Sequence, residues 1–125
     1  MKIFVAHSSN FDFKNELYKP LRESVLNSSH EIILPNETGK EVITKEIIKN
    51  LDVFIAEVSY PSTGQGIELG WADIFKIPII CIFKEGSKTS RSLQYVTNNF
   101  IAYKNVEDMI IKLEEVLGDL SSTSF

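Results

Sequence analysis

The sequence predicts an α/β protein in which helices cover both faces of a five-stranded parallel sheet. Short runs rich in β-branched apolar residues alternate with longer segments in which apolar residues recur every three or four positions, the spacing of one helix face. Two of the runs, residues 53–58 and 78–83, are apolar almost without a break, as is typical of strands buried on both faces of a parallel sheet. Alternation of this kind favours a doubly wound arrangement.

The strands are expected at five places, namely residues 3–6, 31–34, 53–58, 78–83 and 99–103. Five strands in this order predict a flavodoxin-like sheet, in which ligands bind beyond the carboxyl ends of the strands. The loops after the first, third and fourth strands hold the most polar, glycine-bearing and serine-rich stretches of the chain, residues 7–10, 59–66 and 84–92. The sequence therefore predicts a functional site at this edge of the sheet.

The helices are expected between these strands. The first has apolar residues at positions 13, 17, 21 and 25, and Pro20 should end or kink it early. Three further apolar stripes are expected, formed by Val42, Ile43, Ile47 and Ile48, by Ile67, Trp71 and Ile74, and by Val106, Met109, Ile110, Leu113 and Leu117. The last helix has Asn105 as its expected N-cap and Gly118 as its expected end. A short helical turn is expected over residues 90–97, and residues 1–120 are expected to form one domain followed by a disordered tail over 121–125.

Composition narrows the classes of partner. A formal net charge of −4 in 125 residues provides no basic surface for a nucleic acid polymer or an anionic membrane. The two histidines and the single Cys81 do not show the spacing of metal ligands, so neither a metal nor another cofactor is expected, and Cys81 is expected to be a core residue. No apolar run approaches the ~18 residues of a membrane span and no leader pattern is present, which leads us to expect a cytoplasmic protein.

The stretch PSTGQGIELGW, residues 61–71, follows the third expected strand. Its glycines permit a tight turn and the close backbone approach that a ligand requires. A helix is expected to begin near Gly66, which places Glu68 in the first turn, where the helix amides and dipole favour the ionised carboxylate. Such a group could act as a nucleophile or stabilise a developing cation. The alternative is that Glu68 only complements the dipole while residues 62–65 form a capping box.

The longer stretch DVFIAEVSYPSTGQGIELGWA, residues 52–72, resembles the nucleoside 2-deoxyribosyltransferase superfamily, in particular its 2'-deoxynucleoside 5'-phosphate N-hydrolase branch, and the resemblance continues to Ser92. It implies that Glu68 attacks the anomeric carbon, or stabilises the sugar cation, as the N-glycosidic bond of a nucleoside or nucleoside 5'-monophosphate breaks. It implies that Ser62 and the amide of Gly64 hold the 5'-phosphate. Ser92 would reach the phosphate in the neighbouring subunit's site, which implies a homodimer. Water would complete hydrolysis, or a second base would complete transfer.

The sequence departs from the family pattern at two positions. Phe4 stands where the first strand of the family commonly carries a tyrosine, and Thr44 stands where an aspartate assists departure of the base, unless a local shift lets Glu46 or Glu41 substitute. His7 is the natural replacement acid, since its unperturbed pKa near ~6.5 suits proton donation to a base. The alternative is a loop histidine that makes only local hydrogen bonds.

Other polar residues near the expected edge have two interpretations each. Ser8 and Gly66 are further candidates for substrate or phosphate contact, and Asp52 could face the same crevice or serve as a turn residue at a strand end. Glu57 lies inside an apolar strand and must be paired or protonated if buried, which favours a structural role. Trp71 is interpreted as a core or dimer-interface residue, with stacking on a base as the alternative.

Three other functions stay open. A nucleotide-binding module that has lost catalysis would explain Phe4 and Thr44. The opening stretch KIFVAHSSNFDFKNELYKPL, residues 2–21, also resembles TIR-type domains, some of which cleave the glycosidic bond of NAD with a glutamate. A purely structural interaction domain comes third, because it would need no glycine-rich polar loop at the strand ends.

Overall fold

The computed structural model describes residues 1–39 and 43–123. Its sheet consists of β1 (Lys2–His7), β2 (Glu31–Ile33), β3 (Val53–Glu57), β4 (Ile79–Lys84) and β5 (Phe100–Tyr103). All neighbouring strands are parallel, in the order β2-β1-β3-β4-β5. The predicted five-stranded parallel sheet is therefore confirmed, and each strand lies where its apolar run predicts.

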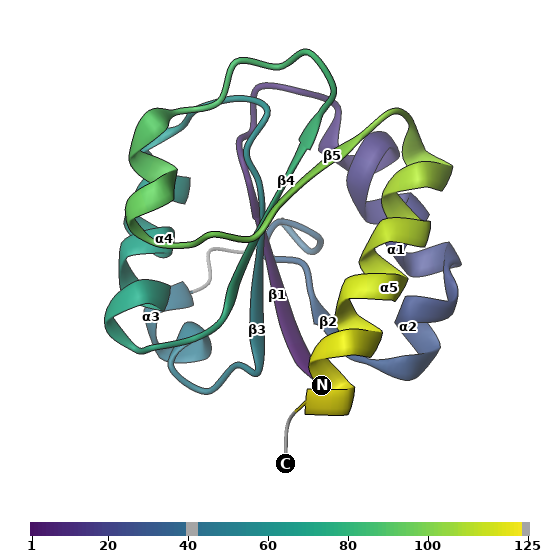
Figure 1. The fold of residues 1–125 in the computed structure, drawn as a ribbon, viewed down its shortest axis with the longest axis horizontal. Helices are drawn as coiled ribbons and strands as arrows, with labels where there is room; N and C mark the ends of the chain where they lie inside the picture. The colour runs from purple at the N-terminus through teal and green to yellow at the C-terminus, as the bar shows by residue number, and fades with distance from the viewer. Residues whose placement is uncertain (40–42, 124–125) are drawn as a thin grey trace.

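The helical segments cover both faces of this sheet, as predicted. They are η1 (Lys14–Tyr18, a π-helical turn), α1 (Lys19–Glu23), α2 (Val25–Ser29), α3 (Thr44–Ile48), α4 (Thr63–Ile74), η2 (Arg91–Tyr95, a 3-10 turn) and α5 (Val106–Thr123). Figure 1 shows α1, α2 and α5 against one face of the sheet and α3 and α4 against the other. The turn η2 confirms the short helical turn expected over residues 90–97.

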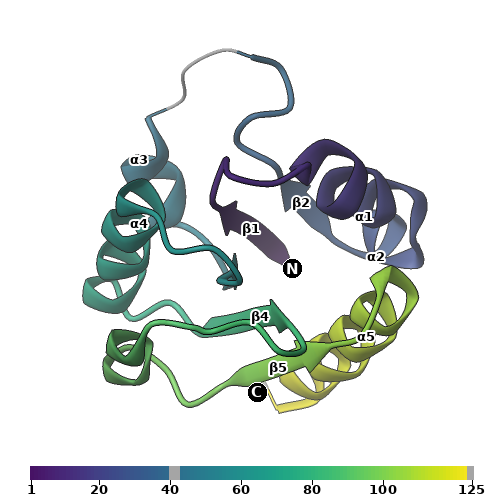
Figure 2. The same ribbon diagram turned by 90° about the horizontal axis from the view of Figure 1, so that it is seen from above.

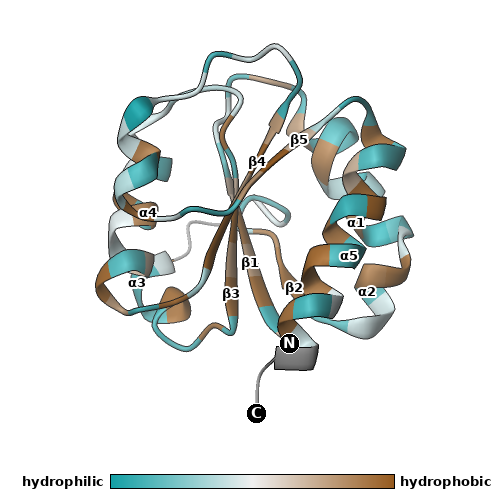
Figure 3. Cartoon of the chain, in the orientation of Figure 1, coloured by the Kyte–Doolittle hydropathy of each residue, from teal (hydrophilic) through white to brown (hydrophobic). Residues whose placement is uncertain are grey.

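Each face of the sheet has its own apolar core, because successive side chains of a strand point to opposite faces. Ile3 and Val5 of β1 pack with residues of α1 and α5, among them Leu21. Phe4 and Ala6 pack into the core on the α3 and α4 side. Figure 3 shows the strands as the most hydrophobic part of the molecule, enclosed between the two helical layers.

The first helical segment is interrupted where a continuous stripe was expected. Pro20 has no N–H to continue the α-helical ladder, and the turn before it is π-helical. Ser24 then adopts an extended conformation and its hydroxyl accepts from Leu26 N at 3.2 Å, which starts α2. The restart changes the helix face, so Val25 is 55% exposed and Leu26 is buried in its place.

Two of the three residues in the apolar stripe expected on α4 face outward, contrary to the prediction, whereas Trp71 is half-buried and packs against the core. Ile67 and Ile74 are 51% and 75% exposed, whereas the core side of α4 consists of Gln65, Leu69 and Ala72. The physical reason is that the Gln65 amide donates to the backbone carbonyl of Glu57, which lets a polar residue occupy the buried face.

The expectations for α3 and α5 hold in part. Ile48 of α3 is buried, Ile43 is an exposed N-cap residue, and Val42 lies outside the described residues. Asn105 caps α5 by accepting from Asp108 N at 2.8 Å, as predicted. The helix continues past Gly118. This glycine does not have the positive φ that would mark a C-terminal turn. Residues 121–123 of the expected tail are therefore helical, and 124–125 lie outside the described residues.

Candidate active site

A cavity of about 790 Å³ lies at the edge of the sheet where the strands end, within the size range of small-molecule sites. Its lining residues come from the end of β1, the segment after β2, the start of α3 and α4, and Figure 2 shows how these elements are arranged. The residues that line it are His7, Ser9, Pro35, Asn36, Gly39, Ile43, Thr44, Ser62, Gly64, Gln65, Ile67, Glu68 and Trp71. We call it the Glu68 cavity.

The start of α4 forms one side of this cavity. Ser62 is the N-cap, and its hydroxyl accepts from Gln65 N at 3.3 Å. The Gln65 side chain does not return to Ser62 but donates to the Glu57 carbonyl, so only half of a capping box forms. The helix begins at Thr63, earlier than the expected start near Gly66, and its first turn holds no acidic residue. Since the dipole effect falls off within the first turn, dipole complementation alone is a weaker account of Glu68.

Glu68 is half-buried and lines the cavity. Burial raises the pKa of its carboxyl group, and the polar side chain of Thr44 acts in the opposite direction. The carboxylate is neither enclosed by packed aliphatic residues nor turned away from the cavity. A partly buried carboxylate with a shifted pKa on a cavity wall is a candidate for contact with a ligand.

His7 also lines the cavity, and both of its ring nitrogens have partners within the protein. Nδ1 lies 2.8 Å from the carbonyl oxygen of Ser8, and Nε2 lies 2.6 Å from the hydroxyl of Tyr18. Burial lowers the pKa of His7, and the backbone hydrogen bond to Ser8 partly opposes this shift. The predicted role of His7 as an acid therefore stays a prediction, because it requires a nitrogen to be released from these bonds.

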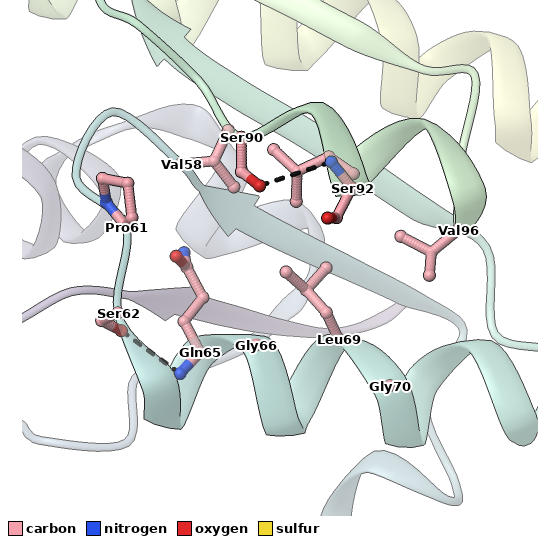
Figure 4. Close-up of a pocket in the computed structure, with 11 residues that line it drawn as sticks. Val58, Pro61, Ser62, Gln65, Gly66, Leu69, Gly70, Ser90, Ser92 and Val96 are labelled. Atoms are coloured by element: carbon pink, nitrogen blue, oxygen red, sulfur yellow. Dashed lines mark hydrogen bonds between the residues drawn. The ribbon is translucent and has the colours of Figure 1, made fainter.

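The other predicted residues are divided between this cavity and a second one of about 260 Å³ (Figure 4). Gly64 lies in the Glu68 cavity, Gly66 and Ser92 lie in the smaller cavity, and Ser62 lines both. Figure 4 shows Ser92 across the smaller cavity from α4, with its backbone N–H bonded to the Ser90 hydroxyl at 3.3 Å. Within one chain, Ser92 thus lies on the other side of α4 from Glu68.

Asp52 and Ser8 do not reach the Glu68 cavity as expected. Asp52 accepts from Lys2 N at 2.7 Å, at the amino ends of β1 and β3, and parallel strands place those ends at the opposite edge from the site. Ser8 is 1% exposed and its hydroxyl accepts from Asn10 N, whereas Ser9 lines the cavity. The prediction for Asp52 as a site residue is therefore wrong, and Ser8 contributes no lining surface.

The two departures from the family pattern have different outcomes. Phe4 is fully buried and stacks on Phe54 with ring centroids 5.5 Å apart, so it is a core residue. Thr44 lies at the cavity beside Glu68. Glu46 is exposed and lies 4.0 Å from the ammonium of Lys49, which leaves it outside the cavity lining, and Glu41 lies outside the described residues.

Glu57 has the structural role that was expected for a buried acid. It is fully buried, and its carboxyl oxygens accept from the Ser59 amide at 2.7 Å, from the Ser59 hydroxyl at 2.9 Å and from the Tyr103 hydroxyl. These bonds hold the backbone that leads into the 59–62 loop. Cys81 is likewise a core residue, and burial raises its pKa to about 12, which makes the thiol inert.

Sequence reasoning missed Tyr18 and Asn36. Asn36 follows the second strand, and its position beyond a strand end is the signal by which the sequence marks it, since ligands bind there in such sheets. Tyr18 carries no such signal, because it belongs to a helical segment and its hydroxyl meets His7 only through packing. Trp71, interpreted as a core or interface residue, lines the cavity, with the Lys45 ammonium 5.9 Å from its ring centroid.

Two negative findings apply to residues 1–39 and 43–123. This part of the chain contains no cluster of three or more histidine, cysteine, aspartate or glutamate residues that could hold a metal ion. None of its helices has both the length and the apolar composition needed to cross a membrane.

No protein-family model matches the chain, but two curated relatives do. A 2'-deoxynucleoside 5'-phosphate N-hydrolase 1 from Thermofilum pendens is 31% identical over 87 residues, which is 64% of this chain and 61% of that protein. A protein of the same name from Syntrophotalea carbinolica is 29% identical over 75 residues, which is 58% of this chain and 53% of that protein. The chain thus matches little more than half the length of each relative.

Solved structures share the fold. The CMP N-glycosidase BcmB of Clostridium botulinum matches with a TM-score of 0.67 and 26% identity, covering 91% of this chain and 99% of that one. A 2-deoxyribosyltransferase of Leishmania mexicana matches with a TM-score of 0.53 and 18% identity, over 66% of this chain and 63% of that one, and at this identity it supports the fold alone. Together with the curated relatives, the BcmB match confirms the resemblance that the Glu68 loop indicates: the chain is similar in sequence to 2'-deoxynucleoside 5'-phosphate N-hydrolases and to a CMP N-glycosidase, and it shares its fold with a 2-deoxyribosyltransferase.

Proposed function

We propose that this protein breaks the N-glycosidic bond of a nucleoside or nucleoside 5'-monophosphate, with Glu68 as the reacting carboxylate. The observation that carries the proposal is the position of Glu68, half-buried on the wall of a cavity of about 790 Å³ at the carboxyl edge of the sheet. The names of the similar proteins, N-hydrolase and N-glycosidase, support the same class of reaction.

The chemistry of the reaction fits a lone carboxylate. Loss of a nucleobase leaves a sugar with oxocarbenium character, and a carboxylate near C1' lowers the barrier either by bonding to that carbon or by electrostatic stabilisation. The neighbouring Thr44 side chain lowers the pKa of Glu68 and so favours its ionised form, against the effect of burial. Water then completes hydrolysis, or a second base completes transfer.

The start of α4 is suited to a phosphate. Ser62 and Gly64 line the cavity on the same helix as Glu68, at the end where helix N–H groups lack helical partners. Hydroxyl and amide donors can hold a phosphate without a strongly basic protein. Binding this remote group would orient the sugar toward Glu68.

We further propose that the protein is a cytoplasmic homodimer. Ile67, Ile74 and Tyr95 are 51%, 75% and 81% exposed, and exposed apolar residues on neighbouring segments are typical of an interface. This arrangement would bring Ser92, which lies away from Glu68 in its own chain, toward the site of the partner. A cytoplasmic location agrees with nucleoside monophosphates as substrates.

The test is the release of free base from a panel of nucleosides, nucleoside 5'-monophosphates, their deoxy forms and NAD. We expect release from at least one nucleoside or monophosphate, and a loss of 10³-fold or more in kcat for Glu68→Gln, as is typical when a group that acts on the reacting atoms is removed. Equal base release by wild type and Glu68→Gln would refute the proposal. Release from NAD alone would instead favour a TIR-like glycohydrolase.

A nucleotide-binding module without catalysis is the second candidate. Thr44 favours it, because a threonine stands where the family uses an aspartate to assist departure of the base. This candidate predicts that a nucleotide raises the melting temperature while no base is released during long incubation. Steady base formation rejects it.

A further inference from the structure

The hydroxyl of Tyr18 joins two walls of the Glu68 cavity. Tyr18 is 4% exposed and ends the π-helical turn η1. Its oxygen lies 2.6 Å from Nε2 of His7, at the end of β1, and 3.1 Å from the backbone nitrogen of Asn36, in the segment after β2. His7 and Asn36 both line the cavity, so one buried hydroxyl connects the cavity residue at the end of β1 with the cavity residue in the segment after β2.

The direction of each hydrogen bond follows from the chemistry of the partners. The Ser8 carbonyl can only accept, so Nδ1 of His7 must carry a proton. The Asn36 backbone N–H can only donate, so the Tyr18 oxygen accepts from it. The Tyr18 hydrogen is then free to point at Nε2, which is an acceptor in the neutral Nδ1–H tautomer.

The surroundings favour this same arrangement. Burial raises the pKa of Tyr18 to about 12, with the backbone bond from Asn36 acting against the shift and the charges of Glu37 and Glu68 adding to it, so the hydroxyl keeps its proton at neutral pH. The ring of Phe13 packs on His7 with centroids 4.4 Å apart. An apolar contact of this kind suits a neutral imidazole.

We propose that Tyr18 is a positioning residue of the site, which holds His7 as the neutral Nδ1–H tautomer and fixes the Asn36 wall opposite α4. His7 then offers no N–H to a departing base, so the proton comes from another group. Among the described residues that line the cavity, none is cationic when His7 is neutral, so the charge of Glu68 stays available for a sugar cation. The catalytic part of this proposal rests on the proposed function, whereas the hydrogen-bond pattern does not.

The hydrogen-bond pattern is tested by ¹⁵N NMR of histidine side chains at a pH above neutrality. The chain has only two histidines, and a His30→Gln variant assigns the signals. We expect the Nδ1–H tautomer for His7, and we expect Tyr18→Phe to move the Nε2 resonance as that nitrogen loses its donor. Tyr95→Phe, which removes a hydroxyl from a side chain 81% exposed, should not move it. An Nε2–H tautomer in the wild type, or an Nε2 signal unchanged by Tyr18→Phe, overturns the proposal.

The catalytic part is tested with Tyr18→Phe, His7→Gln and the double variant on whichever substrate the wild type cleaves. A glutamine is uncharged like the neutral ring, and it cannot act as a general acid at neutral pH. We expect each single variant to lower kcat by roughly tenfold, and the double variant to lose no more, because the two side chains act as one unit. A loss of 10²-fold or more for His7→Gln, the size that a general acid supplies, with Tyr18→Phe near wild type, overturns the proposal. If the wild type cleaves nothing, the proposed function fails while the NMR experiment still decides the hydrogen-bond pattern.

Discussion

The side chains of Glu68 on α4 and Thr44 on α3 lie at the wall of the same cavity, where the Thr44 side chain lowers the pKa of Glu68. The two residues are far apart in the sequence, and they meet because α3 and α4 cover the same face of the sheet (Figure 1). This influence of Thr44 opposes the larger effect of burial, which by itself would favour a protonated carboxyl. Thr44 thus helps to keep the proposed reacting group in its ionised form.

Thr44→Val should narrow the pH range of activity from the acidic side. Loss of the hydroxyl removes the interaction that lowers the pKa of Glu68, so the ionised form appears only at higher pH. The acidic limb of the kcat profile is expected to move upward, with little change at alkaline pH. Thr44→Ser keeps the hydroxyl and should retain the wild-type limb, and identical profiles for all three proteins would contradict this assignment.

Glu68→Gln should stabilise the fold near neutral pH. Burial raises the pKa of Glu68 in the folded state, so the ionised side chain is destabilising, and the favourable contribution of the protonated form is lost as pH rises through the folded pKa. The variant is expected to have the higher melting temperature at pH 7, and the difference should shrink as pH falls through that pKa. Thermal unfolding measured over a pH series tests this prediction. A variant less stable than wild type at pH 7 would contradict the view that the half-buried, ionised carboxylate lowers the stability of the fold.

Replacing Ser62 should separate its role in the helix from its role toward phosphate. Ser62→Ala removes the cap of α4 and should cost about 1 kcal/mol of stability, whereas Ser62→Gly costs only a few tenths. Both remove the hydroxyl, so both should raise KM for a nucleoside 5'-monophosphate while leaving KM for the nucleoside nearly unchanged. Steady-state kinetics on the matched pair of substrates provides the measurement, and equal effects on both substrates would remove Ser62 from the phosphate site.

Tyr103→Phe should destabilise the base of the 59–62 loop. It removes a donor from the fully buried carboxyl group of Glu57, at a cost of about 1.5 kcal/mol, the usual size for a buried hydrogen bond. Tyr95→Phe is the matched control, because Tyr95 is 81% exposed and should change stability by no more than about 0.5 kcal/mol. Urea unfolding measures both, and no difference between the two variants would show that the bond to Glu57 contributes little.

Ile74→Glu should dissociate the proposed homodimer without unfolding the chain. Ile74 is 75% exposed on α4, so a carboxylate there is tolerated in the monomer but not in an apolar interface. Ile111→Glu is the control, since Ile111 is 56% exposed on α5, against the opposite face of the sheet. Sedimentation velocity should show a monomer only for Ile74→Glu. A wild-type monomer, or a dimer in both variants, would argue against an interface on α4.

Local chemistry made much of the fold and part of the site predictable. The β-branched runs identify β3 and β4 because a strand buried on both faces needs apolar side chains in both directions, whereas β2 and β5, at the edges of the sheet, are less buried and give a weaker signal. The loop 61–66 points to Glu68, which follows it directly. Glycines and hydroxyl side chains concentrated after a strand end favour a ligand site over a purely structural turn. Asp52 precedes β3 and therefore lies at the amino edge of the sheet, opposite the cavity. Because ligands bind beyond the carboxyl ends of the strands, the sequence alone already argued against Asp52 as a site residue.

The sequence by itself determined the five parallel strands, the edge of the sheet at which the cavity lies and the loop that brings Glu68 to it, because each depends on residues close together along the chain. Only the tertiary structure decided which face of α4 is buried, since that depends on the bond from Gln65 to the carbonyl of Glu57 on a neighbouring element. It likewise decided that Tyr18 would meet His7 and Asn36. Those contacts join a helical turn, a strand and a loop. The periodicity of one segment cannot show how close it lies to two other segments.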